Sequence, residues 1–415
     1  MNCPPIQRVD TPLPELSGAG MKLSDRIQNI VTGGDDGWSV FYRARALRDA
    51  GHPIIELTMG EHDIGTDRAI LDAMHESGLA GHTGYSLVPG MPELRAAVAA
   101  RLQERTGVPT GSENVVITPG GQAALFAAHA AACDPGDAAL FIDPYYATYP
   151  GTIRAVGATP RPVRVRAEDG FRPQRADLEA TAGPDARSLL INSPNNPTGA
   201  VYDRATLEEI AGVCQDRDLW LISDEVYDTQ VWEGDHISPR SLDGMAGRTL
   251  VVGSMSKSHA MTGSRVGWVA GPAEAIHAIG DLATHNTYGI PPFIQRAALF
   301  ALGRGTEPEQ QVAEPFRRRR SIVLRALDGQ RAITASPIDG AMYAMLDVRA
   351  TGMTGLDFAN GLLDAEQIGV MPGESFGQGG AGHIRVAMTV EDSRLEEALG
   401  RIVAYAEGLM AARTA

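Results

Sequence analysis

Between about residues 90 and 285, short apolar runs alternate with longer amphipathic stretches. Six of these runs have almost no polar residue at alternate positions, as in strands that are buried on both faces: NVVIT, AALFID, SLLINS, LWLIS, TLVVGS and VGWVAG. Segments with helical spacing separate several of them, such as PELRAAVAARLQERTG and RATLEEIAGVCQDRD. The pattern predicts an α/β fold with a mainly parallel sheet and helices on both of its faces. Ligands of such sheets bind beyond the carboxyl ends of the strands, so a site is expected just after these runs.

The length of 415 residues is enough for two or three domains. We expect a large domain at residues 65–305 and a smaller α+β domain at residues 306–415, where a charged helix, GAMYAMLDV, HIRVAM and a final amphipathic helix follow one another. Helical patterning begins near Met21, and residues 22–64 are interpreted as a segment that joins the small domain. Residues 1–21 lack an apolar stretch of signal-peptide length and are expected to form a loose extension.

The composition narrows the classes of function. A net charge of −15 disfavours nucleic acid and anionic membrane surfaces as partners, and no segment approaches the roughly 20 apolar residues that cross a bilayer. The four arginines at residues 317–320 lie in a helix-like stretch and are expected to form a solvated helix face. Cys3, Cys133 and Cys214 form no CxxC pair, which argues against a disulfide framework or structural zinc and favours the cytoplasm.

The end of the first run provides a candidate phosphate cradle. Pro119 is followed by Gly120, Gly121 and Gln122 and then by an alanine-rich helix. Two glycines let the backbone approach an anion closely, and the start of the helix offers unpaired N–H groups and the positive end of the helix dipole. There is no GK[ST] motif, and a plain tight turn is an equal alternative.

The next strand ends add aromatic rings, amides and an acid. Tyr145 and Tyr146 follow AALFID, where an aromatic ring either caps the core or stacks on a flat cofactor. PNNPTG follows SLLINS and predicts a rigid turn from which an amide can face a cleft. Asp224 follows LWLIS, and a carboxylate there needs a cationic or hydrogen-bonded partner. A pyridinium nitrogen is one such partner, and a cap for the next helix is the structural alternative.

A lysine stands at the end of the TLVVGS run. Lys257 lies between Ser256 and Ser258, and Arg265 follows eight positions after the lysine. Hydroxyl and guanidinium groups bind phosphate, and a partly desolvated lysine near other cations favours its amine form, which Schiff-base chemistry needs. A solvated surface lysine is the ordinary alternative. Taken together, the strand ends supply a phosphate cradle, a stacking ring, an acid, a phenol and an amine, which are the contacts of pyridoxal 5′-phosphate.

Seven motifs in this order resemble the class I and II aminotransferases, which are fold type I pyridoxal-phosphate enzymes with the aspartate aminotransferase fold. The resemblance begins near residue 22 and rests on GYSLVPGMPELR, TPGGQAAL, DPYYATY, NSPNNPTGA, SDEVYD, SMSKSHAMTGSRVGW and GHIRVAM. Asn196 and Asp224 are 28 residues apart, as the family pattern leads one to expect. The motifs are most similar to those of the branch that contains arginine–pyruvate transaminases.

The resemblance implies a role for each residue that contacts the cofactor. Lys257 holds the cofactor covalently and moves a proton, and Asp224 keeps the ring nitrogen protonated. Tyr146 stacks on the ring, while Asn196 and Tyr227 hydrogen-bond its phenolic oxygen. The phosphate is expected to contact Gly120, Gly121, Gln122, Ser254, Ser256, Arg265 and, from the neighbouring subunit of a homodimer, Tyr85.

The substrate site is also implied by the resemblance. Arg385 is expected to pair with the α-carboxylate through two hydrogen bonds, next to Gly60 and Asn196. Where the family often has GEPDF or GDPDF, this chain has GEHDI at residues 60–64, so the side-chain pocket is not transferable. A cationic substrate side chain could be received by acids near the entrance, namely Asp35, Asp36, Glu61 and Asp63, although a chain with this net charge has many surface acids.

Two other signals are rejected. GQGGAG fits GxGxxG at Gly377, Gly379 and Gly382, but it precedes a strand instead of joining a strand to a helix, as dinucleotide binding requires. The histidines form no HExxH motif, and His259 is expected to be a helix or pocket-wall residue, so no metal is predicted.

The resulting hypothesis is an aminotransferase that moves an amino group from an L-amino acid to a 2-oxoacid in two half-reactions. A different reaction of the same cofactor, such as β-elimination, decarboxylation or racemisation, is an alternative, because the sequence does not determine which Cα bond stands perpendicular to the ring. A third possibility is the effector-binding lobe of a transcription regulator. It is disfavoured because too few residues precede residue 60 for a DNA-binding domain and because the chain is acidic.

Overall fold

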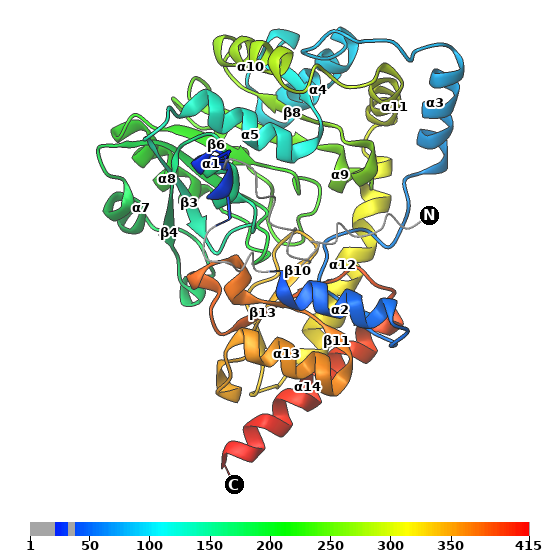
Figure 1. The fold of residues 1–415 in the computed structure, drawn as a ribbon, viewed down its shortest axis with the longest axis vertical. Coiled ribbons are helices and arrows are strands. Elements are labelled where there is room, and N and C mark those ends of the chain that lie inside the picture. Colours follow the sequence, from blue (N-terminus) through cyan, green and yellow to red (C-terminus); the bar gives the residue numbers. More distant parts are fainter. Residues whose placement is uncertain (1–20, 32–37, 415) are drawn as a thin grey trace.

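The computed structural model describes residues 21–31 and 38–414, and its largest sheet has seven strands (Figure 1). The order of the strands is β2-β8-β7-β6-β5-β3-β4. β8 is antiparallel to both of its neighbours, and the other pairs are parallel. The α/β fold with a mainly parallel sheet is therefore confirmed. The strands are β2 (Val115–Thr118), β3 (Ala138–Asp143), β4 (Thr159–Arg164), β5 (Ala186–Asn192), β6 (Trp220–Asp224), β7 (Thr249–Ser254) and β8 (Gly267–Ala270).

Helices cover both faces of this sheet, which explains why its strands have no polar alternation. In β5, Leu190 packs toward one face, and Leu189 and Ile191 pack toward the other. The first face is covered by α5 (Gly120–Ala132), α6 (Tyr149–Ala155) and α10 (Ala273–His285). The second face is covered by α7 (Arg175–Thr181), α8 (Arg204–Asp216), α4 (Pro92–Thr106) and α11 (Pro292–Gly303), and α3 (Arg68–Leu79) packs against α11.

A four-stranded antiparallel sheet with the order β12-β13-β10-β9 lies in the lower part of Figure 1. One buried cluster contains Val40 and Leu57 together with residues between 313 and 406, so the segment before residue 60 packs against the C-terminal part of the chain. The strands are β9 (Thr334–Ala335), β10 (Tyr343–Asp347), β12 (Met371–Pro372) and β13 (His383–Ala387), with a parallel pair β1 (Ile55–Glu56) and β11 (Ile368–Gly369). The helices are α2 (Ser39–Asp49), α12 (Glu307–Leu327), α13 (Gly355–Glu366) and α14 (Asp392–Thr414).

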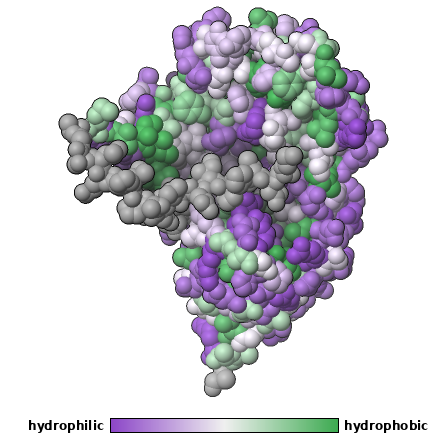
Figure 2. Space-filling model, turned by 45° about the vertical axis from the view of Figure 1, so that its right-hand side comes forward, coloured by the Kyte–Doolittle hydropathy of each residue, from purple (hydrophilic) through white to green (hydrophobic). Residues whose placement is uncertain are grey.

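Two elements differ from what the sequence predicts. β4 is not expected from TPRPVR, because Pro160 and Pro162 have no N–H to donate, but an edge strand tolerates proline since only one of its sides is paired. The helical patterning near Met21 yields only one turn, α1 (Asp25–Gln28). Within the described residues, no helix is long and apolar enough to cross a membrane. The surface seen in Figure 2 is largely hydrophilic, with hydrophobic residues in small groups.

The arginine run in α12 is only partly solvated. Arg317 and Arg318 are exposed, but Arg319 is 3% exposed, so the prediction of a solvated helix face is wrong at this position. The Arg319 guanidinium donates to both carboxylate oxygens of Asp63, at 2.9 and 2.6 Å, and to one oxygen of Asp392 at 3.1 Å. A buried cation needs such partners, and here they connect α12 to the segment before α3.

Candidate active site

One cavity of about 230 Å³ lies at the carboxyl ends of the central strands and brings together most of the predicted residues. Asp224 is the last residue of β6 and Ser254 is the last residue of β7, while Lys257 lies in the following helical turn, α9 (Met255–Ser258). The predicted residues that line the cavity are Gly60, Gly121, Gln122, Tyr146, Asn196, Asp224, Tyr227, Ser254, Ser256, Lys257, Arg265 and Arg385.

Asp224 is 4% exposed. Its carboxylate accepts a hydrogen bond of 2.7 Å from the hydroxyl of Tyr149 and one of 3.3 Å from the N–H of Val226. Burial raises the pKa of Asp224 to about 6, although these hydrogen bonds oppose the shift. Among the described residues, no positively charged side chain bonds to this carboxylate. The site can therefore accept a cationic group beside Asp224.

Lys257 is held from its backbone and from its side chain. The ammonium group donates to the carbonyl oxygen of Gly60, which lies in the same cavity. The carbonyl oxygen of Lys257 lies 3.1 Å from Nε2 of His62 and accepts a hydrogen bond of 3.3 Å from Gln230. Burial, followed by the charge of Lys257, lowers the pKa of His62 to about 4, so this histidine is neutral at physiological pH. The amine thus projects into the cavity from a fixed backbone.

Arg385 and Asn196 also line the cavity and are bound to each other. Nη1 of Arg385 donates to Oδ1 of Asn196 at 2.8 Å, and Nη2 donates to the carbonyl oxygen of Thr58. The backbone N–H of Asn196 is in turn bound by Oδ1 of Asn192 at 2.8 Å, and Nδ2 of Asn192 donates to the carbonyl oxygen of Asp224 at 2.9 Å. Asn192 therefore connects the acid at the end of β6 to the residue that contacts the guanidinium.

Four phenols line the cavity together with the acid and the guanidinium, namely Tyr146, Tyr149, Tyr227 and Tyr343. The Tyr227 hydroxyl lies 2.9 Å from that of Tyr343, and the rings of Tyr146 and Tyr149 form a T-shaped pair with 5.7 Å between ring centroids. Burial raises the pKa of Tyr146 to about 12 and that of Tyr227 well above its usual value, with the neighbouring Tyr343 as the next cause for Tyr227. The phenols of Tyr146 and Tyr227 therefore keep their protons and remain hydrogen-bond donors.

The predicted phosphate cradle lies at the start of α5. Gly120 has a φ of 80°, and a Cβ atom there would lie 2.3 Å from Nη2 of Arg265, so glycine is required for this close approach. Gly120 itself does not line the cavity, but Gly121 does. The Ser254 hydroxyl accepts a hydrogen bond of 3.1 Å from the N–H of Ser256 and donates one of 2.9 Å to its hydroxyl. Helix N–H groups, hydroxyls and a guanidinium together fit a phosphate group.

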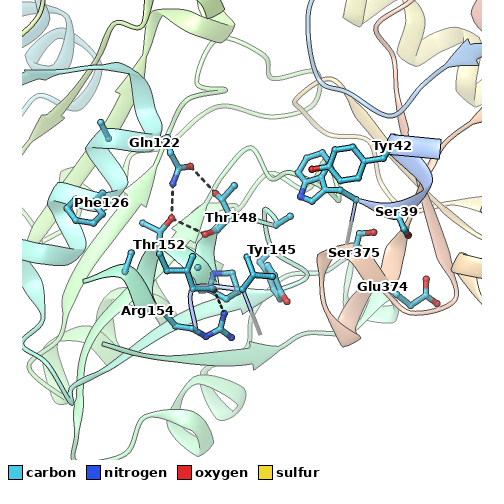
Figure 3. A pocket seen from close by; sticks show the side chains of 18 of the residues that line it. Ser39, Tyr42, Gln122, Phe126, Tyr145, Thr148, Thr152, Arg154, Glu374 and Ser375 are labelled. Carbon is cyan, nitrogen blue, oxygen red and sulfur yellow. Dashed lines mark hydrogen bonds between the residues drawn. The ribbon is translucent and has the colours of Figure 1, made fainter. Parts of the chain in front are cut away.

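A wider cavity of about 960 Å³ opens next to the cradle and shares Trp38, Gln122 and Arg265 with the first cavity. Figure 3 shows that Gln122 points toward Thr148 and Thr152. Oε1 of Gln122 accepts from Thr148 at 2.9 Å, and Nε2 donates to Thr152 at 2.7 Å. The side chain of Gln122 thus fastens α5 to α6 at the point where the two cavities meet.

Several predicted residues lie elsewhere. Tyr85 is 91% exposed, lies outside the cavity and contacts the ring of Tyr288. The idea that Asp63 receives a cationic substrate side chain is wrong, because both of its carboxylate oxygens are bound by Arg319. Asp35 and Asp36 lie outside the described residues. Glu61 is exposed and accepts a hydrogen bond of 3.3 Å from Thr262, which lines the cavity, and His259 is buried at the end of α9.

Sequence reasoning does not find eight other residues of the lining. Tyr149 and Asn192 lie inside the motifs DPYYATY and NSPNNPTGA, so the motifs themselves carry a signal for them. Leu125, Val226 and Thr262 likewise lie inside TPGGQAAL, SDEVYD and SMSKSHAMTGSRVGW. Trp38, Met59 and Tyr343 lie outside the seven motifs, in segments that only the folded chain brings to the cavity. The eight are Trp38, Met59, Leu125, Tyr149, Asn192, Val226, Thr262 and Tyr343.

Comparison with known proteins places this site in a family. The chain is 42% identical to arginine–pyruvate transaminase of Pseudomonas aeruginosa over 94% of this chain and 99% of that protein. It is 34% identical to aspartate/prephenate aminotransferase of Thermus thermophilus over 86% of this chain and 92% of that protein. Among solved structures, Thermus thermophilus aspartate aminotransferase with maleate has a TM-score of 0.87 at 32% identity, covering 93% of this chain and 100% of that one.

A second solved structure, Pyrococcus protein-A1, has a TM-score of 0.88 at 32% identity and covers 95% of this chain and 100% of that one. The family model for aminotransferase class I and II matches residues 52–402. That match contains Gly60, Asp224, Lys257 and Arg385, which the fold brings to one cavity. The chain therefore belongs to the class I and II aminotransferases.

Proposed function

We propose that this aminotransferase holds pyridoxal 5′-phosphate on Lys257 and moves the amino group of an L-amino acid to a 2-oxoacid in two half-reactions. The observation that carries the proposal is the presence of Lys257 and the buried Asp224 in one cavity with the phosphate cradle. The chain contains only two lysines, and the other, Lys22, has a side chain that is 74% exposed and paired with Asp25. When bound, the cofactor supplies a ring that accepts the electron pair of the Cα–H bond.

Each residue has a distinct task in this proposal. Arg385 binds the α-carboxylate of either substrate and thereby orients the Cα–H bond. Lys257 moves the proton that leaves Cα, acting as a general base and then as a general acid. Asp224 stabilises the positive charge on the ring nitrogen, and Tyr227 and Asn196 donate hydrogen bonds to the phenolic oxygen. Tyr146 packs on the ring face and excludes water.

Covalent labelling tests the attachment point. Treatment of the holoenzyme with borohydride and mapping of the peptides should place the label on Lys257, because Lys22 is the only competing lysine in the chain. Lys257→Ala should keep the fold and lose transamination, whereas Lys22→Ala should behave like the wild type. A label on Lys22, or no label in protein saturated with cofactor, contradicts the proposal.

The reaction type has a separate test. Steady-state rates with a panel of amino acids should depend on a 2-oxoacid such as pyruvate. Release of ammonia from an amino acid without any 2-oxoacid would instead favour β-elimination or a related reaction of the same cofactor.

We also propose a donor with a cationic side chain. Support comes from the name of the 42% identical relative and from Glu61, an exposed carboxylate that bonds to Thr262 on the cavity wall. Glu61→Gln should raise the KM for arginine by about fivefold to tenfold and leave that for alanine unchanged, as expected for a partly exposed ion pair. Glu274→Gln, at an exposed acid of α10, is the matched control. Equal KM changes for arginine and alanine would refute the assignment.

A homodimer with shared active sites is a further part of the proposal, with Tyr85 of each subunit reaching the phosphate of the other. The high exposure of Tyr85 supports this arrangement. Mixing Lys257→Ala with Tyr85→Ala protein under subunit exchange should restore activity, since one of the two sites in each mixed dimer is then intact. Failure to restore activity in proven mixed dimers would contradict it.

The domain limits and the compartment stay proposals as well. We propose that residues 65–305 form the large domain and that residues 22–64 join the small domain at 306–415. The pairing of β1 with β11 supports this division. We propose the cytoplasm as the location, and the lack of a disulfide at the buried Cys133 and Cys214 supports a reducing setting.

A further inference from the structure

We infer that Tyr343 is a positioning residue that aligns two side chains of the site, the Tyr227 phenol and the Arg385 guanidinium, with each other. The inference rests on the proposed function, because it assigns a task that exists only when cofactor and substrate carboxylate are bound. Tyr343 begins β10, is 2% exposed and lines the cavity. Its hydroxyl contacts one of the two side chains, and its ring contacts the other.

The hydroxyl of Tyr343 lies 2.9 Å from that of Tyr227. A phenol has one proton to donate, so if Tyr227 donates to the phenolic oxygen of the cofactor, its own oxygen is left to accept the proton of Tyr343. A hydrogen bond received in this way makes Tyr227 a stronger donor. Gly60 packs closely against the Tyr343 hydroxyl and limits its movement, since a Cβ atom at position 60 would lie only 1.7 Å from the hydroxyl oxygen. Only glycine fits at position 60, and the hydroxyl keeps its place beside Tyr227.

The ring of Tyr343 supports Arg385. Cζ of Arg385 lies 4.5 Å from the centroid of this ring and 4.4 Å from the centroid of the Phe376 ring. The buried Nε–H of Arg385 has no partner among the described residues. A planar guanidinium loses its stacking when it tilts, so the two rings hold its orientation for a carboxylate. β10 thus places one side chain against both the cofactor-binding and the carboxylate-binding groups.

Two substitutions separate the hydroxyl from the ring. Tyr343→Phe removes only the hydroxyl, and the pH midpoint of the absorption change of the lysine-bound cofactor should rise by about 0.5 to 1 pH unit, as for one lost hydrogen bond. The KM for the amino donor should stay within about twofold because the ring remains on Arg385. Tyr343→Leu should show the same rise in midpoint and also weaken binding of a 2-methyl amino acid, which cannot lose a Cα proton, by about tenfold.

The shift in midpoint should disappear when Tyr343→Phe is made in a Tyr227→Phe background, because Tyr343 acts through the Tyr227 phenol. Tyr405→Phe, at a tyrosine of α14 that contacts Phe358, is the matched control and should leave the midpoint unchanged. An unchanged midpoint in Tyr343→Phe, or a shift of equal size with and without the Tyr227 phenol, overturns the inference. A wild-type protein without the lysine-bound absorption band, or with the borohydride label on Lys22, contradicts the proposed function instead.

Discussion

Tyr149 donates a hydrogen bond of 2.7 Å to the carboxylate of Asp224, and both side chains are buried. Tyr149 is the first residue of α6 and Asp224 is the last residue of β6, so the bond connects a helix start to a strand end. This hydrogen bond is shorter than the one that the carboxylate accepts from the N–H of Val226. Burial raises the pKa of Asp224, and the bond from Tyr149 is the strongest of the interactions that lower it. The orientation of Asp224 in the site therefore depends on Tyr149.

Tyr149→Phe should weaken cofactor binding by about tenfold and lower kcat by a similar factor, because a hydrogen bond to a charged group contributes about 1.5–3 kcal/mol. Titration of cofactor-free protein by fluorescence measures the first effect, and steady-state rates measure the second. Tyr145→Phe is the matched control at the half-buried neighbour of Tyr146. Equal behaviour of the two variants would show that Asp224 does not need the Tyr149 phenol.

Asp224→Asn should make the cofactor-free protein more stable above neutral pH. The pKa of Asp224 is about 6 in the folded protein, whereas an unfolded aspartate has a pKa of about 3.9, so between these values the folded state binds more protons. The free energy of unfolding of the wild type therefore falls as pH rises through this range, by up to about 3 kcal/mol. Urea unfolding at pH 4.5 and 7.5 should show the larger advantage of the variant at pH 7.5. An advantage that is absent, or that is larger at pH 4.5, contradicts this prediction.

Arg385→Lys should lower kcat/KM by about 100-fold for every amino donor, since each donor has the α-carboxylate and a lysine cannot form the two-point contact. The absorption band of the bound cofactor should stay unchanged. Arg296→Lys, at an exposed arginine of α11, serves as the control. A fall in kcat/KM that is limited to donors with one kind of side chain would indicate that Arg385 binds the substrate side chain instead of the α-carboxylate.

Asp63→Asn should lower the free energy of unfolding by about 1–3 kcal/mol at neutral pH, because it replaces one of the two carboxylates that bind the buried Arg319 and leaves only Asp392 as a charged partner. Burial raises the pKa of Asp63, but the hydrogen bonds and charge of Arg319 outweigh burial, and the net pKa is lowered. A lowered folded-state pKa means that the stabilisation exists above the unfolded value near 4 and is lost as pH falls. Urea unfolding should therefore separate the variant from the wild type at pH 7 more than at pH 4.

The exposed Asp72 of α3, which pairs with Arg68, provides the control Asp72→Asn, with an expected change below about 0.5 kcal/mol. If both variants lose the same free energy of unfolding, the Asp63–Arg319 ion pair stabilises the protein no more than the exposed Arg68–Asp72 pair does.

The sequence by itself determined the α/β class, the mainly parallel sheet and the positions of Asp224, Ser254 and Lys257 at or just after strand ends. Periodicity and motif spacing are local properties of the chain, and the ends of parallel strands necessarily meet at one edge of a sheet. The edge strand β4 could not be predicted from the sequence, because its two prolines leave it without the local pattern that is typical of a strand.

Only the tertiary structure decided which distant side chains meet. Tyr149 and Asp224 are 75 residues apart, Tyr227 and Tyr343 are 116 apart, and Asp63 and Arg319 are 256 apart. No local spacing encodes such a contact, because it arises from the packing of whole helices and strands against one another. The same packing buried Arg319 in a run that reads as solvent-exposed, since an isolated helix gives no sign of what will cover one of its faces.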